Sequence, residues 1–90
     1  MKYPRFTDDM NIREVMDYCV QVKTQKAANR VWEDSIVWSL SHWNVQDMEP
    51  NRVNAEAVMR SNIGYWAGYY GAEAQTRVAK LFRVRHPVFG

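Results

Sequence analysis

The sequence is poor in the residues that disulfides, metal sites and thiol active sites require. Among 90 residues there are one cysteine, Cys19, and two histidines. A single cysteine excludes an internal disulfide and fits a reducing compartment. Neither a CxxC nor an HExxH spacing occurs, and no glycine-rich loop follows a strand pattern. We therefore expect neither a metal site nor any other cofactor.

Long apolar runs and strand patterns are also missing. No apolar stretch approaches the roughly 20 residues that span a bilayer. The first six residues lack the apolar run of a signal peptide. No segment alternates apolar and polar residues long enough to indicate a sheet. The sequence predicts an all-α protein of the cytoplasm that makes no contact with membranes.

What the chain does contain is enough apolar material for a small core. Hydrophobic residues make up 47% of the sequence, so disorder is not expected. Ninety residues correspond to a single domain, which we assign to residues 1–90. A core of this size gives little net stability on its own, so a homodimer is a reasonable expectation.

Apolar residues recur mostly at helical spacing in four segments, about 12–23, 26–43, 52–70 and 72–84. We predict a compact bundle of three to four helices with extended N- and C-terminal arms. Asn11 and Glu14 form a capping-box pattern before the first segment, and Thr24 is placed to cap the second. Gly71 is expected to end the third helix in a left-handed conformation.

The third segment is expected to be the central helix. Ser61, Gly64, Gly68 and Gly71 form one narrow stripe of small residues, on which the fourth helix should dock. Interior glycines cost about 1 kcal/mol each against alanine, and close helix packing is the usual compensation. The second segment has a wider apolar face than a surface helix needs, so it is either buried on two sides or part of a subunit interface.

No arrangement of residues indicates an enzyme. Ser39 and His42 share a helix end, but no third residue is placed to orient the histidine. Cys19 lies in an apolar stripe and is interpreted as a small buried hydrophobe. The adjacent carboxylates of Asp8 and Asp9 would point to different faces of a helix, as would those of Glu33 and Asp34, so neither pair suits acid–base chemistry.

Large aromatic residues and one arginine suit a protein interface, because they bury a large area and keep a polar tip. The alternative is that their rings fill the core, with only the tips at the surface. The interface candidates are Trp38, Trp43, Arg60, Tyr65 and Tyr69.

The charges are unevenly distributed. Those between Trp32 and Glu49 are acidic, and those from residue 77 onward are basic. The basic residues could contact nucleic acid, an acidic partner or the chain's own acidic segment, and the last is the simplest reading. The nucleic-acid candidates are Arg77, Lys80, Arg83 and Arg85, and the acidic residues are Glu33, Asp34, Asp47 and Glu49.

The last third of the chain resembles a segment of small uncharacterised bacteriophage and prophage proteins. The likeness covers about residues 58–90 and is carried by Arg60-Ser61-Asn62-Ile63-Gly64-Tyr65-Trp66-Ala67-Gly68-Tyr69-Tyr70-Gly71, by Arg77-Val78-x-x-Leu81-Phe82 and by His86-Pro87-Val88-Phe89-Gly90. The resemblance implies a phage-encoded protein of the bacterial cytoplasm. Small proteins of this type often act by binding a host or phage protein, for example as inhibitors of host enzymes or of anti-phage defence factors.

Three functions are therefore expected in order. The first is a non-enzymatic protein-binding module, and the second is a nucleic-acid-binding protein that uses a basic C-terminal helix. The third is a small-molecule or nucleotide sponge, with a pocket beside Gly64 and Gly68 walled by tyrosines.

Overall fold

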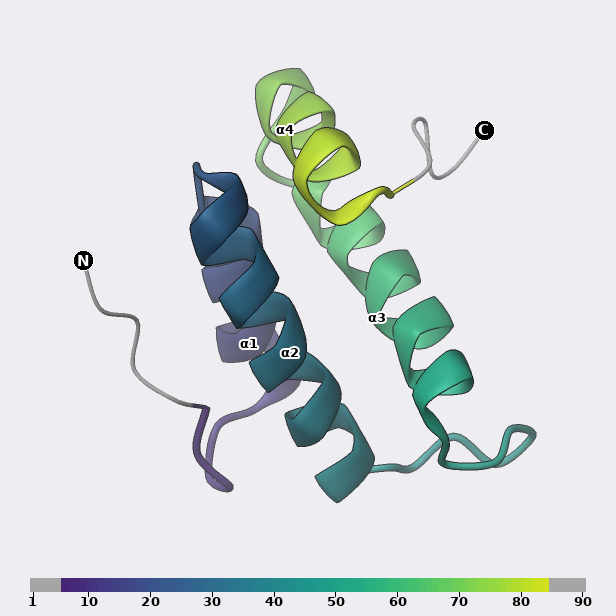
Figure 1. Cartoon of the computed structure of the whole chain (residues 1–90). Helices are drawn as coiled ribbons and strands as arrows, with labels where there is room; N and C mark the ends of the chain where they lie inside the picture. Colours follow the sequence, from purple (N-terminus) through teal and green to yellow (C-terminus); the bar gives the residue numbers. More distant parts are fainter. Residues whose placement is uncertain (1–5, 85–90) are drawn as a thin grey trace.

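The computed structural model describes residues 6–84, and over that range its regular structure is helical throughout (Figure 1). The helices are α1 (Ile12–Gln21), α2 (Gln25–Ser41), α3 (Arg52–Ala67) and α4 (Ala72–Phe82). Every pair of these helices is in contact, which confirms the predicted all-α bundle. Residues 6–11 form a non-helical lead into α1. The outer parts of the two predicted arms, 1–5 and 85–90, lie outside the described residues.

The helices begin where side chains accept hydrogen bonds from free backbone amides. Asn11 Oδ1 accepts from the Glu14 amide at 3.0 Å, and Glu14 Oε1 accepts from the Asn11 amide at 3.1 Å, which confirms the capping box. Thr24 caps α2 as predicted. Asn51 caps α3, so Pro50 precedes this helix instead of occupying its first turn.

Each helix ends two or three residues before its predicted end, at 21, 41, 67 and 82. Val22 turns into an extended conformation (φ −66°, ψ 145°), and Arg83 adopts the left-handed conformation (φ 57°, ψ 38°). Gly71 has a positive φ as expected, but its angles (φ 107°, ψ −180°) are extended and it immediately precedes α4. The prediction that Gly71 ends α3 in a left-handed helical conformation was therefore wrong in position and in ψ.

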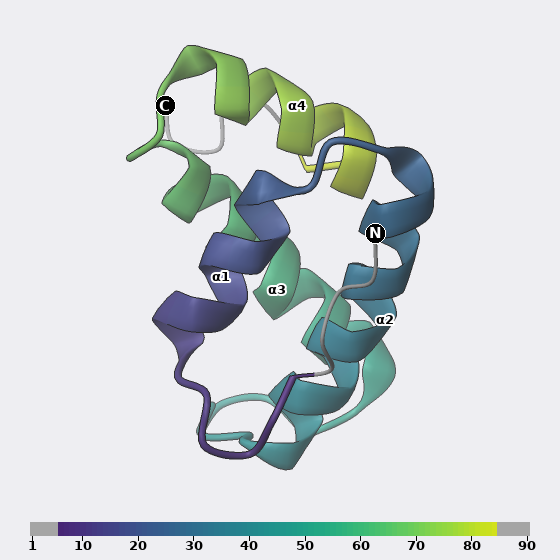
Figure 2. The same ribbon diagram turned by 90° about the vertical axis from the view of Figure 1, so that its left-hand side faces the viewer.

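In Figure 1, α1 lies behind α2, and α3 rises beside them to meet α4 at the upper end. Figure 2 shows α1 in front of α3 and α4 crossing the top of the bundle. The other three helices all pack against α3, as predicted for the central helix. The core takes side chains from every helix and from the residues just after α1 and α4, namely Val15, Met16, Cys19, Val20, Val22, Ala28, Val31, Ile36, Ala55, Met59, Ile63, Ala67, Ala74, Val78, Phe82 and Val84.

The buried face of α3 differs from the predicted stripe of small residues. Of that stripe Gly64 is buried, whereas Ser61 and Gly71 are exposed, so the docking of α4 on a continuous small-residue stripe was wrong. A row at four-residue spacing is buried instead, and it contains Ala55, Met59, Ile63 and Ala67. Helix packing here relies on a mixture of large and small side chains.

The wide apolar face of α2 is covered mainly inside the bundle. This helix packs against α1, α3 and α4, and Trp32, Trp38 and Leu40 lie half-buried against the core. Only Val37 among the apolar residues of the helix is exposed, at 65%. Burial on several sides therefore accounts for the width of this face.

Glu33, in the acidic part of α2, forms an ion pair with Arg52 of α3 and not with the basic residues of α4. Arg52 donates through Nη1 and Nη2 to the two oxygens of Glu33, at 2.9 and 2.5 Å. These bonds lower the pKa of the Glu33 carboxyl. Among residues 6–84 the only other ion pair joins Arg52 to Glu56, so the expected pairing of the basic C-terminal residues with the acidic segment was wrong there.

Candidate functional site

The end of α3 and the turn after it carry four adjoining aromatic side chains, Tyr65, Trp66, Tyr69 and Tyr70, here named the tyrosine face. The exposed fractions are 52% for Tyr65, 72% for Tyr69 and 47% for Tyr70, whereas Trp66 is half-buried against the core. The hydroxyls of Tyr65 and Tyr69 lie 2.8 Å apart, and the two rings meet edge to face with centroids 5.5 Å apart. These contacts hold the two most exposed rings in a defined arrangement.

The tyrosine face is fixed to α1 through Asp17. The Asp17 Oδ1 atom accepts hydrogen bonds from Trp66 Nε1, at 3.3 Å, and from the Tyr70 hydroxyl. The hydrogen bond to Asp17 raises the pKa of the Tyr70 hydroxyl. Two aromatic residues of α3 and its following turn are thereby tied to a neighbouring helix, which limits their freedom before any partner binds.

A hollow of about 510 Å³ is lined by the tyrosine face together with Arg13 and Asp17. Its tyrosine walls agree with the sponge hypothesis, but Gly64 and Gly68 do not line it. The surface offers aromatic rings, hydroxyls and one charge of each sign. That combination suits contact with another protein better than a dedicated anion or cation site.

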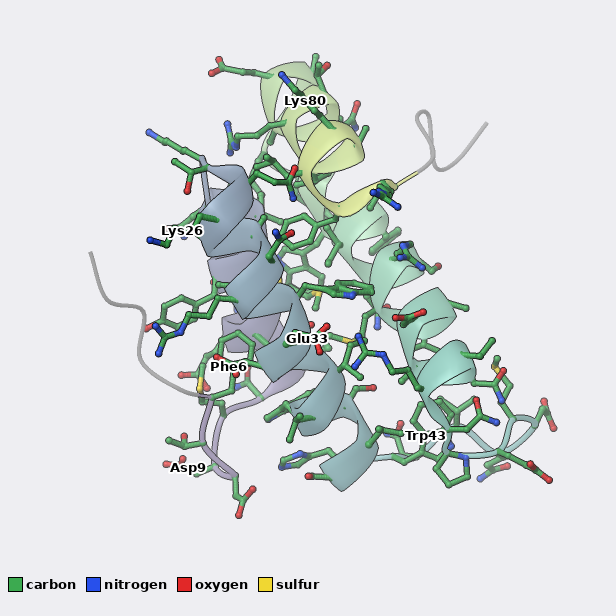
Figure 3. The ribbon with its side chains drawn as sticks, viewed as in Figure 1. Phe6, Asp9, Lys26, Glu33, Trp43 and Lys80 are labelled. Carbon is green, nitrogen blue, oxygen red and sulfur yellow. The ribbon has the colours of Figure 1, made fainter. Side chains whose placement is uncertain are left out.

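The five predicted interface residues lie in three separate places. Tyr65 and Tyr69 belong to the tyrosine face, whereas Trp38 and Trp43 lie near the end of α2, at the lower end in Figure 3 where Trp43 is labelled. Trp43 Nε1 donates to the backbone oxygen of Met48 at 3.0 Å. This indole therefore braces the loop between α2 and α3.

Arg60, the fifth candidate, donates a hydrogen bond to a backbone oxygen at the end of α4. Its guanidinium carbon lies 4.8 Å from the centre of the Trp32 ring, and its Nε donates to the Phe82 oxygen at 3.2 Å. Gln25 Nε2 donates to the neighbouring Leu81 oxygen at 3.0 Å. The last carbonyls of a helix have no partner within it, and a cation there is favourable to the helix dipole. Arg60 thus has a structural task in the bundle.

The four basic residues predicted to contact nucleic acid also differ in their surroundings. Arg77 Nη2 donates to the Val20 oxygen near the end of α1, at 2.8 Å. Lys80 and Arg83 are exposed, and Arg85 lies outside the described residues. In the described part of the chain, Lys80 and Arg83 are therefore the two nucleic-acid candidates that remain exposed and available to a partner.

Two lysines that were not predicted from the sequence, Lys23 and Lys26, lie at the same end of the bundle as Lys80 and Arg83. The hydrogen bond from Gln25 to Leu81 joins positions 56 apart and sets the start of α2 beside the end of α4. Figure 3 shows Lys26 and Lys80 at the same end of the molecule, with Asp9 at the other. No local pattern signals such proximity. We name this exposed group the basic end, and it comprises Lys23, Lys26, Lys80 and Arg83.

His42 fastens the N-terminal lead to the end of α2. Its Nδ1 lies 2.8 Å from the Trp38 oxygen, and its Nε2 lies 2.8 Å from the Asp8 oxygen. The ring also stacks on Trp38, with centroids 4.4 Å apart. Carbonyl oxygens only accept, so both ring nitrogens can donate only in the protonated form. The bond to Asp8, followed by that to Trp38, raises the pKa of His42.

We expect the free energy of unfolding to fall as the pH rises through the raised pKa of His42. The folded chain holds this proton more tightly than the unfolded chain. The stabilisation is therefore complete below the ordinary histidine pKa of about 6.5 and is lost as the pH passes the folded-state value. Urea unfolding at about pH 5.5 and about pH 8.5 measures the difference, and His42→Gln should reduce it. An equal difference in both proteins would assign the titration to other groups.

The side chains of Cys19 and His42, considered for chemistry in the sequence, are both engaged in the fold. Burial raises the pKa of the Cys19 thiol to about 12, so this cysteine is not a nucleophile. Both nitrogens of His42 face backbone carbonyls, which leaves no free base for Ser39. Within residues 6–84 no three histidine, cysteine or carboxylate side chains converge as metal ligands. Nor does any helix in that range have the length and apolar character needed to cross a membrane.

The chain matches no protein-family model, no curated protein and no solved structure. The resemblance of residues 58–90 to phage and prophage proteins therefore stays a prediction.

Proposed function

We propose that this chain is a small, non-enzymatic protein-binding module whose contact surface is the tyrosine face. The observation that carries the proposal is the exposure of Tyr65, Tyr69 and Tyr70 side by side on one part of the surface. Tyrosine is enriched at interface hot spots because it buries a large area with little loss of side-chain entropy. The bonds to Asp17 and between the two hydroxyls hold the rings ready for contact.

The proposed partner is a bacterial host or phage protein, and the proposed effect is inhibition of a host enzyme or an anti-phage defence factor in the cytoplasm. This finer part of the proposal rests on the resemblance of residues 58–90 to small phage and prophage proteins. A second copy of the chain is the other occupant to be tested, because a bundle of this size gains stability by self-association.

Replacing Tyr65 and Tyr69 together by alanine is expected to weaken partner binding by at least about thirtyfold. Truncating one hot-spot aromatic costs about 2 kcal/mol or more, which is a factor of about 30 in Kd. Both side chains are exposed, so the free energy of unfolding should change by less than about 1 kcal/mol. The measurement is capture from a bacterial lysate on immobilised protein, followed by titration with the purified partner.

The matched control replaces Val37 and Val53, which are 65% and 74% exposed on other parts of α2 and α3, by serine. This variant also removes two exposed apolar side chains, and it should bind the partner like the wild type. An unchanged Kd in the tyrosine variant would refute the proposed surface. Sedimentation analysis adds one further outcome, because a homodimer that the tyrosine substitutions dissociate would assign the surface to self-association.

A second candidate function is nucleic-acid binding through the basic end. It is favoured by the addition of Lys23 and Lys26 to the exposed Lys80 and Arg83. The same capture experiment separates the two functions when it is repeated after nuclease treatment. Loss of the captured proteins, together with an affinity for a short duplex that falls steeply with salt, would support this candidate.

A further inference from the structure

A second hollow lies at the other end of the bundle from the basic end. Its lining residues come from the lead into α1, the end of α2 with the residues after it, and the middle of α3. Figure 2 shows how these elements are arranged in the bundle. Its volume is about 460 Å³, and small-molecule pockets occupy about 300–1,000 Å³. Its apolar walls include Met10, Trp38, Trp43 and Val58. It shares no lining residue with the hollow of the tyrosine face.

Polar groups without partners converge on this hollow. Ser39 is only 6% exposed and Asn62 is half-buried, and both line it. Within residues 6–84 neither side chain makes a hydrogen bond, so their polar atoms are open to a ligand or to water. The Nε1 atom of Trp38, which also lines the hollow, is buried and has no partner there. For a buried group such as Trp38 Nε1, the lack of a hydrogen bond costs about 1–3 kcal/mol. Such a group in a folded protein commonly indicates a bound water or ligand.

Apart from His42, whose ring is cationic below its raised pKa, the walls of the hollow carry no charge. None of its lining residues is an aspartate, glutamate, lysine or arginine. His42 lines it as well, but both of its ring nitrogens are engaged by backbone oxygens. At a pH above the pKa of His42, a charged ligand would lose hydration here without gaining an opposite charge, which is strongly unfavourable. The hollow is therefore suited to an uncharged molecule.

We propose that this hollow binds a small uncharged molecule that has an apolar body and one amide or hydroxyl group. The apolar body would pack against Trp38, Trp43 and Val58. The polar group would bind Ser39 Oγ and the Asn62 carboxamide, both of which can donate and accept. This ligand site is separate from the proposed protein-binding surface, and either proposal can fail without the other.

Benzamide is the test molecule, and its charged and apolar relatives benzoate, benzylammonium and toluene are the comparison set. Indole N–H resonances report binding by NMR, because Trp38 and Trp43 line this hollow while Trp32 and Trp66 line others. Benzamide should shift the Trp38 and Trp43 signals saturably and leave the other two unchanged. At about pH 8.5, where His42 is neutral, benzoate and benzylammonium should bind at least about tenfold more weakly, because an unpaired buried charge is disfavoured.

Asn62→Leu keeps the size of the side chain and removes both hydrogen-bonding groups, so benzamide affinity should fall about fivefold, the effect of one hydrogen bond. Ser39→Ala should weaken binding similarly, and Asn29→Leu, in another hollow, should leave it unchanged. Three results would overturn the proposal. The first is that benzamide leaves the Trp38 and Trp43 signals unshifted, as expected for a hollow that holds only water. The second is equal affinity for benzamide and its charged or apolar relatives, and the third is wild-type affinity in both Asn62→Leu and Ser39→Ala.

Discussion

Replacing Ile63 by alanine is expected to lower the free energy of unfolding by about 2–5 kcal/mol. Ile63 is completely buried in the row of α3 that faces the other helices. Removing its outer carbons leaves a cavity that neighbouring side chains fill only partly. A folded domain has a total stability of about 5–15 kcal/mol, so this loss is a large part of it. Urea unfolding followed by circular dichroism measures the change.

Val53→Ala is the control on the same helix. Val53 is 74% exposed, so its truncation should change the free energy of unfolding by no more than about 0.5 kcal/mol. If the two substitutions destabilised the chain equally, the buried row of α3 would not be the centre of the core. In that case the four helices could still be assigned correctly, but the face of α3 that points into the core would be incorrect.

Replacing Gly71 by alanine is expected to destabilise the chain by about 1–3 kcal/mol through the backbone alone. Gly71 combines φ 107° with ψ −180°, a conformation that is essentially restricted to glycine. A Cβ atom at this position would meet no atom within 4 Å outside Gly71 itself and its two neighbours in the chain. A steric clash with neighbouring groups therefore cannot cause the loss. Thermal unfolding of the two proteins gives the measurement.

A chain made by chemical synthesis with D-alanine at position 71 provides the matched control. A D-residue prefers positive φ, and it carries the same methyl group as L-alanine. The D-alanine chain should retain the stability of the wild type, while the L-alanine chain should not. Equal losses in both chains would place the cause in the methyl group and not in the backbone conformation.

The helices could be predicted from the sequence because their signals are local. The Asn11 and Glu14 capping box and the Thr24 cap form within a few residues of the chain, and the structure contains both. The face of α3 was harder to choose. Its small residues lie along one side and its large residues along the others, so periodicity alone did not select the row that contains Met59 and Ile63.

The roles of individual charged residues could not be predicted, because they depend on helix ends that are distant in sequence. Arg60 and Arg77 look like surface cations in the sequence. In the fold they donate to Phe82 and Val20, at separations of 22 and 57 positions. That Tyr65 and Tyr69 share a face could be anticipated, since they are one helical turn apart. Their exposure could not, because the same pattern also fits rings that fill the core. The attachment of the tyrosine face to α1 through Asp17 depends on tertiary packing and has no local signal.

The long-range bonds to the ends of α1 and α4 bear on how the chain could be divided. Arg77 of α4 donates a hydrogen bond to a carbonyl oxygen at the end of α1, while Gln25 of α2 and Arg60 of α3 donate to carbonyl oxygens at the end of α4. A fragment that lacks any one of these helices would expose backbone groups or lose the donors that satisfy them. The amides in the last turns of α1 and α4 should therefore exchange with solvent only when the whole bundle opens. We therefore expect the four helices to unfold as one cooperative unit, with no helix stable when separated from the others.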